Sequence, residues 1–304
     1  MNKKNYSQRR KIKSQSMYHI MMLPGMLFLF VFSYIPMFGI IMAFQDYVPA
    51  KGILGSKYVG LKHFKYMFSL PDIGQIFANT MIIAIGKIIL GTFMAICFAI
   101  LLNEIRSKFF KKSVQTIVYL PHFLSWVVLA AVVVNMVNLD GIVNVLLETI
   151  GIGKINFLGS NTWFRPMIIL TDVWKEFGYN SIVYLAAITA IDPGLHEAAA
   201  MDGAGWWKRV WHITLPGMLP IILLMAAMNL TSILSAGFDQ IYNLYSPMVY
   251  QTGDVLDTYV YRMGLISRQY SFSTAVGLLR SVVGMILMLS ANAFAKKFTD
   301  SKIF

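Results

Sequence analysis

Charged residues are scarce in this chain. They make up 13% of its 304 residues, whereas hydrophobic residues make up 57% and the mean hydropathy is +0.61. An average soluble protein has about 25% charged residues, and so few charges cannot solvate the surface of a soluble fold of this size. A disordered chain, in turn, would contain far fewer apolar side chains. The composition therefore indicates a polytopic membrane protein and argues against a soluble enzyme.

The sequence also lacks the residues that several kinds of site require. Its single cysteine, Cys97, excludes an internal disulfide and a cysteine-based metal centre. The five histidines have no paired spacing, so we expect no metal site. The phosphate-binding pattern G-x-x-x-x-G-K-[ST] is absent, so we expect this chain to bind no ATP and to contain no catalytic residues.

Long apolar stretches are the main feature that the sequence does contain. A helix needs about 20 apolar residues to cross the hydrocarbon core of a bilayer. Six stretches meet this length and predict an all-α membrane protein with about six transmembrane helices: 20–44, 77–102, 114–137, 165–191, 215–236 and 273–295.

Lysine and arginine distinguish the two sides of the predicted spans. They are concentrated at one side, in segments 1–19, 103–113, 192–214 and 296–302, and are sparser in the loops at the other side. Cytoplasmic loops carry an excess of these residues. We therefore predict a protein of the plasma membrane with both termini in the cytoplasm, in which a basic tail (1–19) precedes one transmembrane domain (20–304). The same bias accounts for much of the net charge of +12, so we expect no nucleic-acid partner.

The cytoplasmic loop 192–214 combines helix-forming and helix-breaking residues. Pro193 disfavours helix at the residue before it, and Glu197 opens a run of good helix formers. The segment 202–205 interrupts this helix, and tryptophans then recur at helical spacing. The pattern predicts a short helix-turn-helix at the membrane surface. A helix that merely anchors the loop in the interface is the alternative interpretation.

This loop resembles the EAA loop of binding-protein-dependent ABC importer permeases. In that family the loop docks on the ATP-binding subunit and transmits nucleotide-driven closure to the spans. The resemblance therefore implies a coupling role for the residues that match the pattern: Glu197, Ala198, Ala199, Asp202, Gly203, Ala204, Ile213, Leu215 and Pro216.

Segments 24–47, 59–64, 238–265 and 270–279 are also similar to carbohydrate-uptake permeases of the maltose type, above all to the LplB-like polysaccharide or oligosaccharide group. The similarity implies a permease subunit that imports sugars, with oligosaccharides as the expected class, by alternating access. It also implies a second homologous permease, two ATP-binding subunits that bind ATP and Mg²⁺, and an extracytoplasmic sugar-binding protein. A polyol, phosphate ester or peptide is the alternative solute, and an ion-driven secondary transporter is the rival class.

Polar residues within and after the spans are candidates for the substrate pathway. Ionisable groups are costly inside a membrane, so they are functional candidates by default. Asp172, Lys175 and Glu176 have a spacing that lets them partly neutralise one another. Hydroxyl, amide, carboxylate and aromatic groups suited to sugars recur further on: Asn229, Ser232, Asp239, Tyr242, Asn243 and Tyr245. Pairing between helices is the competing explanation for all of these residues, and the sequence assigns no role to Lys87 or Arg280.

Overall fold

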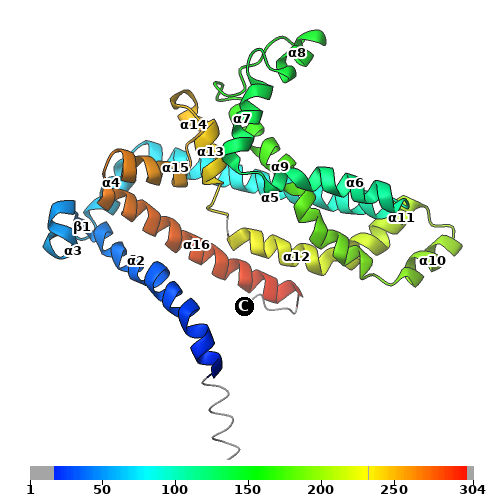
Figure 1. Ribbon diagram of the computed structural model, residues 1–304, viewed down its shortest axis with the longest axis horizontal. Coiled ribbons are helices and arrows are strands. Elements are labelled where there is room, and N and C mark those ends of the chain that lie inside the picture. Colours follow the sequence, from blue (N-terminus) through cyan, green and yellow to red (C-terminus); the bar gives the residue numbers. More distant parts are fainter. Residues whose placement is uncertain (1–16, 232, 300–304) are drawn as a thin grey trace, which may run out of the picture. The chain divides into compact units, whose positions relative to one another are not determined.

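The computed structural model describes residues 17–231 and 233–299 and consists almost entirely of helices (Figure 1). Within the described residues the strands are β1 (Gln45–Asp46) and β2 (Lys57–Tyr58), which pair antiparallel with Gln45 opposite Tyr58. The all-α class expected from the apolar stretches is therefore confirmed.

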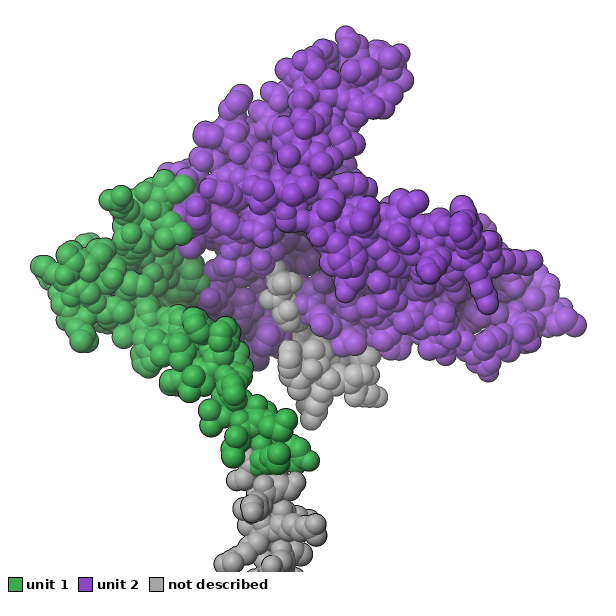
Figure 2. Space-filling view, in the orientation of Figure 1, with its two compact units in different colours: residues 1–67, 263–278 green, residues 68–262, 279–304 purple. Residues whose placement is uncertain are grey.

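The chain forms two compact units (Figure 2). Unit 1 contains the described residues of 1–67 together with 263–278, and unit 2 contains 68–262 and the described residues from 279 onward. Unit 1 begins with the apolar helix Met17–Phe44, in which a π-helical turn (Phe30–Tyr34) precedes Pro36. A departure from regular α-helix is expected just before Pro36, because proline has no N–H group to donate within a helix. After β1 come α3 (Gly52–Gly55), β2 and α4 (Lys62–Ser69), which ends at the start of unit 2.

Unit 2 is a bundle of helices with several short elements between them. Its long members are α5 (Asp72–Glu104), α9 (Phe164–Thr189), α12 (Leu215–Thr231) and the later part of α16 (Tyr270–Thr299). The shorter helices are α6 (Lys108–Tyr119), α7 (Trp126–Val137), α8 (Ile142–Thr149), α10 (Pro193–Met201), α11 (Trp206–Arg209), α13 (Phe238–Leu244), α14 (Tyr250–Gly253) and α15 (Leu256–Tyr261).

Helices α5 and α9 form the most extensive helix–helix contact and run parallel. Their orientation follows from two apolar clusters. The first joins Ile83 of α5 to Ile168 of α9, and the second joins Ala99 to Ile188, further along both helices. Helices α7 and α13 complete the first cluster, and α12 completes the second. The stretch of α5 and α9 between the clusters contains Lys87, Asp172, Lys175 and Glu176.

The first, second, fifth and sixth predicted spans each overlap a helix that is long and apolar enough to cross a membrane, whereas the third is divided and the fourth is not among such helices. Five helices among the described residues are long and apolar enough to cross a membrane: Met17–Phe44, Asp72–Glu104, Trp126–Thr149, Trp206–Leu230 and Tyr270–Ser290. Helix α9, which corresponds to the remaining expected span, is 26 residues long but carries Asp172, Lys175 and Glu176.

The prediction of one continuous helix over 114–137 is wrong. Helix α6 ends at Tyr119, a 3₁₀ turn covers Leu120–Phe123, and α7 starts anew after Ser125, whose hydroxyl accepts a hydrogen bond from the N–H of Val128. Pro121 explains the break, because its ring displaces the carbonyl four residues back and it donates no hydrogen bond.

Asn79 of α5 fastens α14 and Asp254, which follows it, to the bundle. It is fully buried, donates to the carbonyls of Gln251 (3.1 Å) and Asp254 (2.9 Å), and accepts from Arg165 of α9.

Asn79→Ala leaves these groups without a partner, which we expect to cost about 1–3 kcal/mol of folding free energy. The purified protein should show a lower apparent melting temperature. Gln75→Ala, which removes an exposed donor to the same Asn79, is the matched control. Equal melting temperatures for the two variants would contradict this role.

Candidate functional site

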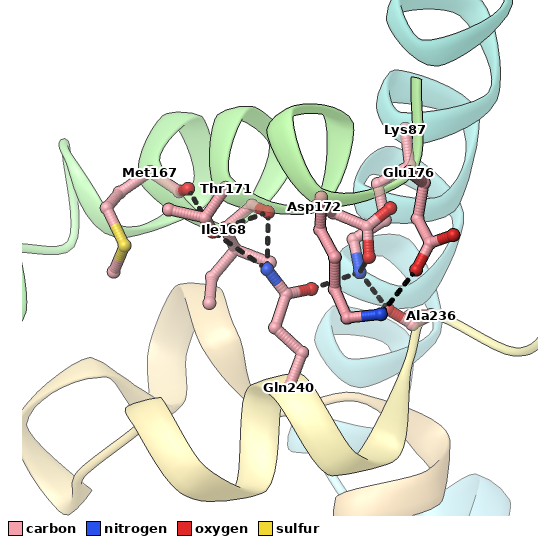
Figure 3. Close-up of polar contacts among 9 residues, drawn as sticks. Lys87, Met167, Ile168, Thr171, Asp172, Glu176, Ala236 and Gln240 are labelled. Atoms are coloured by element: carbon pink, nitrogen blue, oxygen red, sulfur yellow. Dashed lines mark hydrogen bonds and ion pairs between the residues drawn. The ribbon is translucent and has the colours of Figure 1, made fainter. Parts of the chain in front are cut away.

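Four ionisable residues of α5 and α9 gather in a polar cluster between the two apolar clusters: Lys87, Asp172, Lys175 and Glu176. The Lys87 ammonium lies 3.1 Å from Asp172 Oδ1 and donates to the carbonyl of Ala236 at 2.7 Å and to the side-chain oxygen of Gln240 (Figure 3). Lys87 and Asp172 are both largely shielded from solvent. A charge removed from water needs a charged or hydrogen-bonding partner, and each of these two supplies one for the other.

Gln240 connects this ion pair to the start of α13. Its amide nitrogen donates to the carbonyl of Ile168 (2.7 Å) and to the hydroxyl of Thr171 (2.8 Å) of α9, and the residue is fully buried. The chain reaches α13 through Gly237, whose φ of +93° is a backbone conformation that favours glycine. A Cβ there would lie 2.9 Å from the Lys87 ammonium, so a larger residue would displace the lysine.

Glu176 and Lys175 belong to a second, adjoining set of contacts. Lys175 is buried and donates to Glu176 Oε1 (2.8 Å) and to the carbonyl of His122 (2.9 Å). The His122 ring lies 2.6 Å from Glu176 Oε2 and stacks on Tyr179 at 3.8 Å between ring centroids. The expected neutralisation within α9 thus holds for Lys175 and Glu176, whereas Asp172 pairs with Lys87 of α5.

A small cavity of about 140 Å³ adjoins this cluster. It presents carboxylate, ammonium, amide and phenol groups to a space bounded by α5, α9 and α12. Its polar lining includes three of the predicted pathway residues, Asp172, Glu176 and Asn229, together with Lys87, Asn180 and Tyr184. Such a set of donors and acceptors is able to bind hydroxyl groups.

The predicted residues of α13 form a separate surface. Asp239, Tyr242 and Asn243 are exposed on one face of this helix, and the opposite face is buried. The ring of Tyr242 lies 5.2 Å from that of Phe238 and 4.9 Å from that of Tyr261. The ring of Tyr245 contacts that of Tyr250, and the Arg262 guanidinium lies over the Tyr250 ring, 4.1 Å from its centroid. Ser232 lies outside the described residues.

Arg280 has a local explanation. Its guanidinium pairs with Asp257 of α15 and donates to the carbonyl of Leu234 at 3.1 Å. It thereby holds the segment after α12 against α15, which is a structural use of the charge.

The loop 192–214 forms a helix and a tight turn, as predicted, but with different boundaries. Helix α10 begins at Pro193, directly after Asp192, whose carboxylate accepts from the N–H of Gly194 at 2.9 Å. It ends in a turn at Gly203, whose φ is +78°. The second predicted helix is not separate, because α11 continues through the π-helical turn Val210–Thr214 into α12.

The matched residues of the loop differ in exposure. Glu197 and Ala198 are exposed on α10, as are Asp202 and Gly203 in the turn, whereas Ala199, Ala204, Ile213 and Leu215 are partly buried and Pro216 is exposed. A cavity of about 280 Å³ lies behind the loop. Its lining includes Glu104 at the end of α5, Arg106 after it, His196 of α10, and Trp206 and Arg209 of α11.

Comparison with known proteins decides the family. Residues 87–300 match the model of the binding-protein-dependent transport system inner membrane component. This chain belongs to that family. It is therefore a membrane-embedded permease subunit, which confirms the resemblance drawn from the loop and argues against the ion-driven alternative.

Two relatives of Bacillus subtilis (strain 168) match nearly the whole chain. The polygalacturonan/rhamnogalacturonan transport system permease protein YteP is 43% identical over 295 residues, which are 97% of this chain and 92% of the relative. Protein LplB is 38% identical over 302 residues, 99% of this chain and 95% of the relative. The expected similarity to the LplB-like group is confirmed.

The fold matches a solved bacterial ABC transporter involved in the import of the acidic polysaccharide alginate. The TM-score is 0.88 at 38% identity, over 96% of this chain and 99% of the matched chain. A second structure of a bacterial alginate ABC transporter, in complex with an alginate pentasaccharide-bound periplasmic protein, matches with the same TM-score and identity over 98% of its chain.

Several residues of the site were not among the sequence candidates. Gln240, Asn180 and Tyr184 are unremarkable as single letters, and His122 is one of five histidines without paired spacing. The charges within the predicted spans, Asp172, Lys175 and Glu176 above all, are the signals that pointed to the cluster, because such charges require partners.

The Lys87–Asp172 pair yields a prediction for stability. Lys87→Met leaves a shielded carboxylate without its cation, so we expect a loss of about 3 kcal/mol or more and a lower apparent melting temperature. Asp172→Asn should also lower it. The double variant should recover much of the loss because no unpaired charge remains. Melting curves of the purified complexes test this. Strictly additive losses in the double variant would show that the two groups do not depend on each other.

Proposed function

We propose that this permease subunit imports oligosaccharides, with acidic plant-type or algal-type glycans as the leading class. The supporting observation is its 43% identity, over nearly its full length, to a permease named for polygalacturonan and rhamnogalacturonan transport. The solved alginate importer, with the same fold at 38% identity, supports the same class. A polyol, phosphate ester or peptide remains the alternative solute.

The polar cluster suits the passage of a saccharide. Asp172, Glu176 and Asn229 offer hydrogen-bonding groups at the cavity beside Lys87, and Lys175 holds Glu176 in position. Because Lys87 and Asp172 balance each other, the cavity has no strong excess of charge from this pair. We assign these residues to the lining of the substrate pathway.

The exposed face of α13 supplies a second part of the proposed pathway. Tyr242 and Tyr245 present aromatic rings, and Asp239 and Asn243 present polar groups on the same short helix. Flat aromatic rings combine an apolar face with a polar edge, and sugar rings have apolar C–H faces and hydroxyl rims that match them. Ser232 is the remaining candidate in this group.

The loop 192–214 is the proposed contact with the ATPase. Glu197 and Ala198 are exposed on α10, and the Gly203 turn fixes the end of this helix. A second homologous permease would complete the pathway, and two ATP-binding subunits would bind ATP and Mg²⁺ and hydrolyse the nucleotide. An extracytoplasmic binding protein would deliver the sugar. This arrangement places both termini, including the basic tail 1–19, in the cytoplasm and assigns 20–304 to the transmembrane domain.

Uptake into proteoliposomes tests the proposed substrate. The complete importer, with its binding protein, should accumulate labelled oligogalacturonides only when ATP is present on the side of the ATP-binding subunits, and ionophores should not abolish uptake. Maltotriose, glycerol 3-phosphate and a tripeptide are the comparison solutes. Accumulation of one of these in preference to every oligosaccharide would refute the substrate class, and loss of uptake on collapse of an ion gradient would refute the ATP-driven mechanism.

The coupling role of the loop has its own test. Glu197→Lys reverses an exposed charge on α10, so we expect it to abolish uptake and co-purification of the ATP-binding subunit while membrane insertion stays normal. Gly203→Asp should act in the same way, since it places a Cβ and a charge at a left-handed turn. Glu148→Lys, the same reversal at an exposed position of α8, is the control. Normal uptake by a correctly inserted Glu197→Lys variant would rule out the assignment.

A further inference from the structure

Unit 1 contains a cavity of about 560 Å³ that is separate from the polar cluster of unit 2. This volume falls within the range of small-molecule sites, which is about 300–1,000 Å³. Three segments line it: residues 46–48 after the first helix, the outer face of α4, and residues 268–272 at the start of α16.

Aromatic side chains form two walls of this cavity. The rings of Tyr47 and Tyr270 lie edge to face at 6.1 Å, and those of Tyr66 and Phe272 at 5.4 Å. The N–H of Tyr47 donates to the hydroxyl of Ser271 at 2.8 Å, which fixes the segment after the first helix to the start of α16. The walls are therefore held in place by hydrogen bonding as well as by packing, and a ligand meets a prearranged surface.

The charges at the cavity leave one cation without a partner. Asp46 accepts from the Lys62 ammonium at 2.8 and 3.0 Å and lies 3.1 Å from the His63 ring. The hydrogen bond from Lys62, helped by the charges of Lys62 and His63, holds the pKa of the Asp46 carboxyl below its usual range, so Asp46 is ionised near neutral pH and matched by Lys62. Among the described residues, none forms a hydrogen bond or an ion pair with the Arg268 guanidinium.

Arg268 also occupies an unusual backbone position. Its φ is 55°, in the left-handed region, and it is the one described residue other than glycine with a positive φ. Glycine adopts this conformation without steric cost, whereas a residue with a Cβ does not. Strained backbone of this kind gathers at binding sites, where the side chain has a use that outweighs the cost. An exposed, unpaired arginine at such a position indicates a ligand for its guanidinium.

The basic loops of unit 1 point the same way. Lys51, Lys57, Lys62 and Lys65 follow the first helix, on the side predicted to be extracytoplasmic, with Asp46 as the acidic residue between positions 45 and 69. Lysine and arginine are normally depleted on that side of the membrane. These exposed lysines give this part of unit 1 a positive field that attracts anions.

From these observations we propose that the unit 1 cavity is an accessory saccharide site, in which the Arg268 guanidinium binds the carboxylate of a uronic acid residue while the sugar ring packs on the aromatic walls. Arginine suits this ligand, because its planar fork donates two parallel hydrogen bonds to a carboxylate. The inference rests on the proposed oligosaccharide import. It adds a site that recognises the charge of the glycan outside the polar cluster.

Binding of digalacturonate to the complete importer tests this site. The importer is held in nanodiscs of phosphatidylcholine, and the dissociation constant is measured by calorimetric titration, with the dimethyl ester of digalacturonate as the neutral probe. Arg268→Gly removes the guanidinium and relieves the left-handed backbone, so it should fold at least as well as the parent. Arg268→Lys keeps the charge but loses the fork. Lys65→Ala removes an exposed cation of α4 that does not line the cavity.

We expect Arg268→Gly to weaken digalacturonate binding at least about tenfold, as for loss of a charged hydrogen bond. The affinity of Arg268→Lys for digalacturonate should be intermediate, and that of Lys65→Ala should equal the affinity of the parent. The dimethyl ester should bind the parent as weakly as digalacturonate binds Arg268→Gly. Equal binding by the parent and Arg268→Gly would overturn the site. The site would also be overturned if phosphatidylglycerol displaced digalacturonate from the parent and this displacement required Arg268. That result would assign the cavity to a lipid headgroup. Because ATP-driven uptake is measured separately, failure of this site is distinguishable from failure of the proposed function.

Discussion

The ion pair between Lys87 and Asp172 constrains the centre of unit 2. A lone charge between two apolar clusters is unfavourable, so the ammonium must find acceptors wherever the fold supplies them. It finds a carboxylate on α9, a backbone carbonyl at Ala236 and an amide oxygen on α13. One side chain of α5 thereby fixes the positions of two other elements. The entry to α13 in turn requires glycine at 237, because a side chain there would occupy the position of the ammonium.

Helix α12 connects the loop 192–214 to the polar cluster. It continues from α11 through the π-helical turn Val210–Thr214, and it is followed by the segment before Gly237. This helical segment thus lies between two glycines with left-handed backbone, Gly203 in the loop and Gly237 at the polar cluster. Hinges in proteins are a few residues at the ends of such elements. In the proposed importer, α12 is therefore the element that joins the loop 192–214 to the polar cluster.

The elements that sequence predicted best are those set by local rules. Apolar length identified most of the spans, and Pro193, together with the glycines around 203, delimited α10, because these residues act on their own backbone. The prediction of the third span was wrong because a local rule, the effect of proline on its own helix, was outweighed by hydropathy. Its hydropathy is continuous across Pro121, yet the proline divides it into two helices.

The contacts of the site could not be predicted in the same way. Lys87 and Asp172 were each recognisable as costly charges, but α9 offered Asp172 a nearer cation in Lys175, and only the packing of α5 on α9 decides the partner. Arg280 and Asp257 pair for a similar reason, through packing of α16 on α15 that no spacing within a single helix predicts. Gln240 gave no signal at all, since a single buried amide has no characteristic spacing. Local conformation is encoded in a few adjacent residues, whereas pairing depends on the whole fold.

The difference in charge between the polar cluster and the unit 1 cavity has a physical rationale. Inside the membrane an unpaired arginine would attract a uronate carboxylate strongly, because the effective dielectric constant is low and no salt screens the pair. A pathway residue that binds so tightly would retain the solute, and passage requires binding that is weak enough to release it. The cluster at Lys87 meets this requirement by neutralising its own cation with Asp172. At the exposed Arg268, water and salt weaken the same attraction, so charge recognition can operate there without trapping the glycan. Selection of an acidic oligosaccharide by charge is therefore better placed in unit 1, with hydroxyl recognition in the balanced cluster of unit 2.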